Sequence, residues 1–227
     1  MNEVFQKIKN GLIVSCQAEG NSPFNSPEGV LLFAQSAYQG GAVAIRSEGI
    51  EKTKTIINSI QLPVIGLIKS SFNDGYVRIT GSWKDVEDLQ SIGTSIIAID
   101  GTFRKRENLT GPEFIAEVKK KINCVVMADI ATDEEAIACA VAGADCVSTT
   151  LSGYTPETRS SGDSPDYELL ESLAKQLSIP VIAEGRINTP EIAATMKSLG
   201  AWSIVVGSAI TRPTEITRWF VQSMKNK

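Results

Sequence analysis

Eight short apolar segments, spaced evenly along the 227-residue chain, are the feature that most constrains its fold. Each is continuous in its apolar character and does not alternate with polar residues, which is typical of strands buried on both faces of a parallel sheet. We predict strands over Leu12–Ser15, Ala42–Ile45, Pro63–Leu67, Ser95–Ile99, Asn123–Ala128, Asp145–Ser148, Pro180–Ala183 and Trp202–Val206.

An amphipathic segment follows each of these strands, and five of the segments open with a residue that favours a helix N-terminus. The five are Ser26, Thr110, Thr132, Ser164 and Thr189. Thr110 and Thr132 are each followed three positions later by glutamate, which is the spacing of a capping box. Eight strand–helix units in this length predict a closed (β/α)8 barrel, or TIM barrel, that forms a single domain over residues 1–227.

The structural alternative is an open, doubly wound α/β sheet. Such a sheet would commonly carry a G-x-G-x-x-G phosphate-binding turn after its first strand. The first strand here is followed by SCQAEGNSPF, which lacks that pattern. The even spacing of the eight units also favours the barrel.

Composition restricts the classes of partner and cofactor. The net charge of −4 argues against a nucleic-acid partner or an anionic membrane surface, and we find neither an apolar run of 18 residues nor a signal peptide. We therefore expect a cytoplasmic protein. The four cysteines stand singly in apolar segments, so we expect them to form neither disulfides nor metal sites. The chain has no histidine, so any acid–base chemistry must fall to lysine, glutamate, aspartate, tyrosine or cysteine.

Polar residues stand where the predicted strands end, and in a barrel these positions surround the functional site. They are Gln17, Arg46, Lys69, Asp100, Asp129, Thr149 and Glu184, with Gly207 after the eighth strand. Any one of them is equally well explained as a solvated turn residue. A cluster of lysine, arginine, aspartate and glutamate at one barrel mouth points to function, because buried charges are costly unless they are paired.

The order of the strands predicts how these groups are arranged. Strands three and seven face each other across an eight-stranded ring, so Lys69 and Glu184 can lie on opposite sides of a small molecule. Arg46 is on the strand next to Lys69, and Asp129 lies between the two sides.

The loops after the seventh and eighth strands predict a phosphate site. They read AEGRINTP and VVGSAITRP, and TIM barrels commonly bind phosphate at these two loops through glycine backbone amides. Gly185, Arg186, Gly207 and Ser208 fit this use. The residues alone therefore indicate a phosphate-binding barrel enzyme that carries out proton transfer, or forms a Schiff base, on a phosphorylated carbonyl compound.

The chain resembles the bacterial N-acetylmannosamine-6-phosphate 2-epimerase family along essentially its whole length. Seven sequence strings in the expected order carry the resemblance: GLIVSCQA, GGAVAIR, LPVIGLIK, MADIAT, TTLSGYT, VIAEGRINTP and VVGSAITRP. The chain departs from the family pattern after Lys69, where Ser70, Ser71 and Phe72 follow in place of the arginine and tyrosine that many members have.

The resemblance implies an epimerase that interconverts N-acetylmannosamine 6-phosphate and N-acetylglucosamine 6-phosphate in amino-sugar and sialic acid catabolism, without metal or cofactor. It implies that Lys69 is the catalytic base and that Glu184, Asp129 and Arg46 assist it. The substrate-binding residues that we predict from strand ends and resemblance together are Gln17, Thr149, Gly185, Arg186, Gly207, Ser208 and Arg212.

Two further expectations concern alternatives and assembly. A lysine in such a barrel can also act as the nucleophile of a Schiff-base aldolase or synthase on a phosphorylated sugar, and the barrel can also serve as a non-enzymatic sugar-phosphate sensor. The last predicted helix, 213–227, has a broad apolar face. One interpretation is that this face covers its own barrel beside the eighth strand. The family resemblance implies a homodimer, in some members formed by exchange of this helix.

Overall fold

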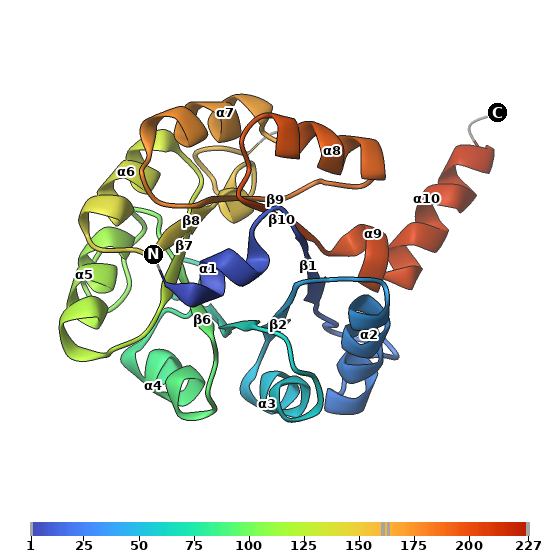
Figure 1. Cartoon of the computed structure of the whole chain (residues 1–227), viewed down its shortest axis with the longest axis horizontal. Helices are drawn as coiled ribbons and strands as arrows, with labels where there is room; N and C mark the ends of the chain where they lie inside the picture. The colour runs from blue at the N-terminus through green and yellow to red at the C-terminus, as the bar shows by residue number, and fades with distance from the viewer. Residues whose placement is uncertain (1, 160–161, 163, 226–227) are drawn as a thin grey trace.

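The computed structural model describes residues 2–159, 162 and 164–225, and within them eight parallel strands close into a barrel (Figure 1). The strand order around the barrel is β1-β10-β9-β8-β7-β6-β3-β2. The strands are β1 Leu12–Cys16, β2 Ala44–Glu48, β3 Val64–Leu67, β6 Ile96–Asp100, β7 Val126–Asp129, β8 Cys146–Ser148, β9 Val181–Glu184 and β10 Ser203–Val206. All eight predicted strands are present, which confirms the (β/α)8 barrel and excludes the open sheet.

Helices surround the barrel, and most begin at the predicted caps. They are α2 Pro27–Gln39, α3 Ile50–Ser59, α4 Trp83–Ser91, α5 Gly111–Lys121, α6 Asp133–Val141, α7 Tyr167–Gln176 and α8 Pro190–Ser198. The prediction of Ser164 as a cap was wrong: Asp166 caps α7, because its carboxylate accepts a hydrogen bond of 3.0 Å from the Leu169 amide. None of the described helices is long and apolar enough to cross a membrane.

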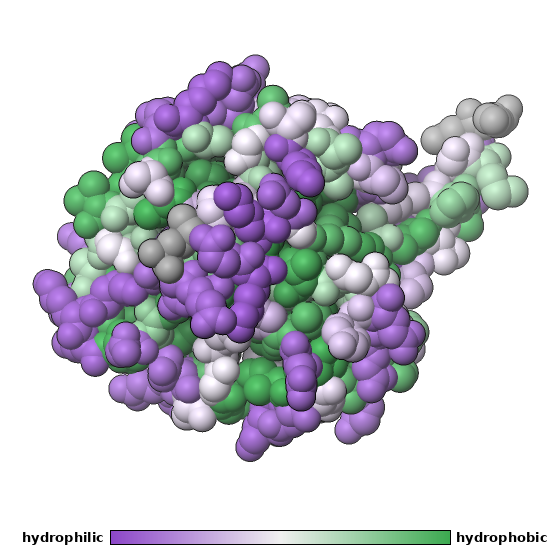
Figure 2. Space-filling model, viewed as in Figure 1, coloured by the Kyte–Doolittle hydropathy of each residue, from purple (hydrophilic) through white to green (hydrophobic). Residues whose placement is uncertain are grey.

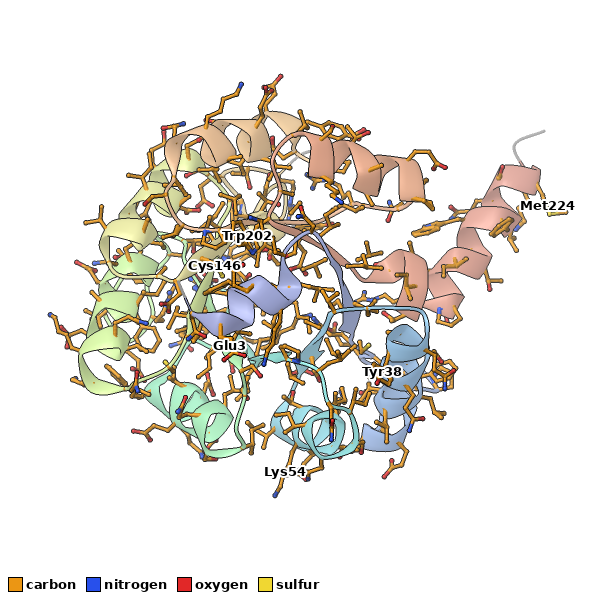
Figure 3. All side chains as sticks on the ribbon, in the orientation of Figure 1. Glu3, Tyr38, Lys54, Cys146, Trp202 and Met224 are labelled. Atoms are coloured by element: carbon orange, nitrogen blue, oxygen red, sulfur yellow. The ribbon has the colours of Figure 1, made fainter. Side chains whose placement is uncertain are left out.

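A short helix, α1 Glu3–Ile8, closes the barrel at the amino ends of its strands (Figures 1 and 3). Phe5 and Ile8 of this helix are buried in the cluster that fills the barrel interior. The indole nitrogen of Trp202 donates a 2.9 Å hydrogen bond to the Phe5 carbonyl, which ties the helix to the start of β10. This helix has no counterpart among the predicted elements. The helix covers apolar surface that would otherwise face water where the barrel opens at the amino ends of its strands.

An antiparallel hairpin, β4 Lys69–Ser71 with β5 Val77–Ile79, interrupts the regular pattern after β3. Its turn contains the Asp74-Gly75 pair, with Gly75 at φ 81°, a common hairpin turn signal that our strand prediction did not use. The Thr80 amide donates to the Ile68 carbonyl over 2.6 Å, which closes the base of the hairpin. Lys69 is therefore the first residue of a strand and not the start of an open loop.

The C-terminal segment forms α9 Ser208–Thr211 and α10 Pro213–Lys225. The expectation that the last helix covers its own barrel was wrong, because α10 projects away from the barrel and none of its described residues is buried (Figure 1). Apolar side chains along it face solvent: Phe220 is 69% exposed, and Met224, near the end of the helix in Figure 3, is 79% exposed. Figure 2 shows apolar surface on the projecting helix. The last two residues of the predicted helix, 226–227, lie outside the described residues.

Close packing at Gly111 gives a test of the fold. A Cβ atom at Gly111 would lie 2.5 to 2.7 Å from backbone atoms of residues 100–102. We expect Gly111→Ala to lower the free energy of unfolding by about 2 to 3 kcal/mol, because backbone cannot move aside as a flexible side chain can. Urea denaturation measures this change.

Gly40→Ala is the matched control for this variant. Gly40 has φ −75°, and the closest atom to an added Cβ is 3.3 Å away. We expect the Gly40 variant to stay within about 1 kcal/mol of the parent protein. Equal losses in the two variants would contradict the packing argument.

Candidate active site

A cavity of about 290 Å³ opens at the carboxyl ends of the barrel strands. The side chains and turns that line it come from several βα loops, as expected for a barrel of this kind. Nine of the eleven predicted site residues line it: Gln17, Arg46, Lys69, Glu184, Gly185, Arg186, Gly207, Ser208 and Arg212. The other two predicted site residues, Asp129 and Thr149, are within the described structure but do not line the cavity.

A buried ion pair lies at the base of this cavity. The Arg46 guanidinium, on β2, donates two hydrogen bonds to the Asp129 carboxylate, at 2.6 and 3.2 Å, and lies 3.4 Å from the carboxylate of Glu184. Arg46 is 1% exposed and Asp129 is fully buried. Burial alone would lower the pKa of Arg46, but the charges of Asp129 and Glu184 outweigh it and raise that pKa. Arg46 therefore stays cationic at any pH at which the protein is folded.

Glu184, the last residue of β9, presents its carboxyl group to the cavity. Its side chain is 14% exposed and accepts a 2.9 Å hydrogen bond from the Thr150 hydroxyl. Burial raises the pKa of Glu184 above the usual value of a glutamate, with Asp129 adding to the effect and Arg46 opposing it. A carboxyl group with a raised pKa exchanges a proton more readily near neutral pH, which is the property of a general acid or base.

Asp129 binds the Arg46 guanidinium and does not line the cavity itself. The strand order confirms that Asp129, the last residue of β7, lies between β3 and β9. Its carboxylate is fully buried against Arg46. Thr150 connects the groups further, with its hydroxyl 2.8 Å from Asp129 and 2.9 Å from Glu184. These contacts fix the orientation of Arg46 and Glu184.

The two threonines after β8 have different environments. They lie in a short 3-10 turn, η1 Thr149–Leu151. The Thr149 hydroxyl accepts from the Glu184 amide (3.0 Å) and donates to the Glu184 carbonyl (2.9 Å), so it anchors the backbone of β9. Thr150 lines the cavity instead. The turn begins directly after the strand and rotates the second threonine toward the barrel mouth, which a strand-end rule cannot distinguish.

Lys69 reaches the cavity from the hairpin side, and its ammonium group forms an ion pair with Glu19. Glu19 was not among the predicted site residues; it follows Gln17 by two positions in the loop after β1. Burial tends to raise the pKa of Glu19, but the hydrogen bond and the charge of Lys69, together with Arg212 and Lys52, hold it below its usual value. Glu19 is therefore an anion at neutral pH.

The predicted phosphate loops also line the cavity. Gly185 has φ 106°, a conformation that favours glycine, and it turns the chain sharply after β9. Gly207 and Ser208 lie between β10 and α9, and Arg212 is 41% exposed beside them.

Two predicted residues, Arg186 of the phosphate loops and Asp100 of the strand ends, hold loops in place. Arg186 lines the cavity, but its guanidinium donates to the carbonyls of Ser152 (3.0 Å) and Ser164 (2.6 Å) and so fastens the loop after β8. Asp100, at the end of β6, is fully buried and pairs with Arg104 at 2.9 Å and Arg106 at 3.1 Å. Within the described part of the chain, no three histidine, cysteine, aspartate or glutamate side chains are placed to hold a metal ion.

Comparison with known proteins identifies the family. Residues 30–226 match the sequence profile of the family described as "Putative N-acetylmannosamine-6-phosphate epimerase". The chain belongs to this family. Two relatives named "Putative N-acetylmannosamine-6-phosphate 2-epimerase" are each 46% identical to it. The relative from Caldanaerobacter subterraneus subsp. tengcongensis aligns over 99% of this chain and 95% of its own, and the one from Clostridioides difficile over 98% and 99%.

Solved structures support the same relationship. The fold is similar to that of the N-acetylmannosamine-6-phosphate 2-epimerase from Clostridium perfringens, with a TM-score of 0.91 and 44% identity, over 97% of this chain and 96% of that one. A thiamine phosphate pyrophosphorylase from Pyrococcus furiosus, at 19% identity and a TM-score of 0.62, shares the barrel fold.

Removal of Asp129 tests the importance of the buried ion pair. We expect Asp129→Ala to lower the free energy of unfolding by about 3 kcal/mol, because Arg46 stays buried and loses its main partner. Chemical denaturation measures the change. Asp88→Ala is the control, since Asp88 pairs with Lys84 on the surface, and it should cost at most about 0.5 kcal/mol. A loss at Asp129 as small as that at Asp88 would disprove the structural role.

Proposed function

We propose that this protein interconverts N-acetylmannosamine 6-phosphate and N-acetylglucosamine 6-phosphate, the activity of an N-acylglucosamine-6-phosphate 2-epimerase. Membership of the epimerase family supports the substrate. The observation that carries the mechanism is that Lys69, Glu184 and Arg46 line one cavity, with the phosphate loops beside them. An amine, a carboxyl group and a fixed cation are what a proton transfer next to a carbonyl requires.

The reaction inverts carbon 2, so its C–H bond must break and form again on the other face. That hydrogen is acidic when carbon 1 is a carbonyl, which requires the sugar ring to open first. Removal of the proton leaves an enolate, and its return to the opposite face gives the epimer. Lys69 pairs with Glu19 as an ammonium ion in the free protein, so it must first release a proton to solvent. The neutral amine then takes the proton from carbon 2, and its long, flexible stem lets it reach both faces of that carbon.

Arg46 stabilises the enolate oxygen as negative charge develops there. Its guanidinium is fixed by Asp129 and Thr150 holds the neighbouring Glu184, so both groups are oriented before the substrate arrives. Glu184 supplies and receives protons during ring opening, or delivers the proton to the second face of carbon 2. Asp129 acts through Arg46 and does not contact the sugar.

The phosphate holds the open-chain sugar in place. We assign the turns at Gly185 and Gly207, the Ser208 segment and Arg212 to the 6-phosphate group, and Gln17 to the sugar. Their position on the cavity wall supports this assignment. A phosphate bound at one end restricts the flexible chain and lowers the entropic part of the barrier. Thr150 takes the place that we predicted for Thr149, whose hydroxyl is bonded to the Glu184 backbone.

A proton NMR assay in heavy water tests the proposal. We expect the purified protein to convert N-acetylmannosamine 6-phosphate to N-acetylglucosamine 6-phosphate and to exchange the hydrogen at carbon 2. Lys69→Ala should lower turnover by at least about a thousandfold, since general-base catalysis contributes on this scale. Lys84→Ala, on the surface, should leave turnover unchanged.

The same assay separates the two proton-transfer schemes. In a one-base scheme Lys69 serves both faces, so some of the original hydrogen returns to the product. In a two-base scheme Lys69 and Glu184 act on opposite faces, and internal return is lost. Full turnover in Lys69→Ala would remove Lys69 from the central role.

We also place the activity in the cytoplasm, within amino-sugar and sialic acid breakdown. The family's substrate supports the pathway. All four cysteines are free and buried, as is usual in a reducing compartment. Burial raises the pKa of Cys16 to about 12, so this thiol is unreactive at neutral pH.

We further propose a homodimer in which α10 of each protomer packs on the other. An apolar groove of about 450 Å³ lies beside β10, between α8 and α9, where the last helix of a barrel would ordinarily pack. In the described chain α10 leaves this groove open and exposes its own apolar face (Figures 1 and 2). Exchange of the helix between two copies would cover both surfaces at once.

Substitution on the exposed helix tests this assembly. We expect Phe220→Asp to convert the dimer to monomer at micromolar concentration, because a buried aromatic anchor contributes at least about 2 kcal/mol to an interface. Gln222→Asp introduces the same charge on the polar face of α10 and should leave the dimer intact. Sedimentation velocity measures both variants. A monomeric parent protein would disprove the proposal.

A further inference from the structure

One carboxylate oxygen of Glu19 contacts two cations that line the cavity. Its carboxylate forms the ion pair with Lys69 and lies 3.8 Å from the guanidinium of Arg212. Lys69 is the proposed base and Arg212 is assigned to the phosphate. A carboxylate of the protein itself therefore contacts both of these groups, from a position in the pocket that adjoins the cavity at Gln17 and Arg212.

The loop that carries Glu19 is held by specific contacts. Lys52, on α3, donates to the Ala18 carbonyl at 3.0 Å and to the Asn25 side chain at 2.7 Å. Asn25 in turn donates to the Gly20 carbonyl at 2.9 Å. These bonds fasten the residues on both sides of Glu19. The backbone at Glu19 is thus held by the fold, and its carboxylate is directed by the contacts with Lys69 and Arg212.

The charges around Glu19 conflict with the needs of the bound substrate. A phosphate next to Arg212 would lie close to the Glu19 carboxylate, and like charges repel at such separations. Glu19 is 43% exposed, so solvent reduces this repulsion without removing it. A phosphate dianion competes for Arg212 more strongly than a single carboxylate does, since it carries more charge and more acceptor oxygens. An unphosphorylated sugar offers no such group.

We propose that Glu19 is a counter-ion that the phosphate of the substrate displaces from Arg212, while the same carboxylate positions the Lys69 side chain. This proposal rests on the proposed function. Glu19 is then a positioning residue for the base and a selectivity residue for phosphorylated sugars, because a neutral sugar cannot take Arg212 from it. Phosphate binding is weaker than it would be without Glu19, because the phosphate must displace this carboxylate from Arg212. In return, the ion pair with Glu19 holds the Lys69 side chain at the site of proton transfer.

The variant Glu19→Gln separates these two effects. We expect inorganic phosphate to bind about threefold more tightly, since Arg212 no longer faces an anion. We expect kcat to fall about tenfold, since Lys69 loses a charge-assisted hydrogen bond that orients it. Phosphate binding is measured by calorimetry and kcat with N-acetylmannosamine 6-phosphate. A purely structural role would weaken both and would not tighten the binding of phosphate.

Two further variants complete the experiment. Glu19→Asp keeps the negative charge but shortens its reach, so phosphate affinity should stay within about twofold of the parent while kcat falls. Glu51→Gln removes an exposed carboxylate on α3 and should leave both quantities unchanged. Unchanged phosphate affinity in Glu19→Gln would overturn the displacement, and unchanged kcat would overturn the positioning. If the parent protein shows no epimerisation, the proposed function fails, whereas calorimetry still reports the phosphate site.

Discussion

The buried ion pair between Arg46 and Asp129 is the interaction on which the rest of the site depends. A guanidinium enclosed by the barrel is stable because a carboxylate from β7 binds it through two hydrogen bonds. The same cation lies 3.4 Å from Glu184 on β9. One cation thereby connects side chains from the carboxyl ends of three strands that are far apart in sequence. The barrel can therefore keep a charge at the base of its cavity.

The other charges at the mouth are arranged around this pair. Glu184 is kept close to Arg46 by Thr150, and its raised pKa follows from burial near Asp129. Lys69 extends into the site from the hairpin, and the carboxylate of Glu19 balances the charge of its ammonium group. Each charged group of the site therefore has a partner of opposite charge within the chain. An anionic ligand can bind a cation of the site only if its oxygens replace the carboxylate that the cation contacts in the free protein.

The loops and helices outside the barrel divide into two kinds. The loops after β6 and β8 are held by buried or half-buried arginines, which gives the cavity wall a fixed shape. The last helix, by contrast, leaves its barrel and exposes its apolar face, while the groove beside β10 stays open. The chain thus combines a site held by many internal contacts with an uncovered apolar surface. This surface adjoins the site, because Ile187 and Asn188 line both the groove and the cavity.

The sequence by itself determined the eight strands, the barrel and the residues at the strand ends, because apolar periodicity and helix caps are local signals. It also placed Lys69, Glu184 and Arg46 at one mouth, since parallel strands end at the same edge. The tertiary structure alone decided that Glu19 meets Lys69, 50 residues away, that Thr150 and not Thr149 faces the cavity, and that α10 leaves the barrel. Such outcomes depend on how a turn rotates a side chain and on which surfaces approach through space, and neither is encoded in a short stretch of residues.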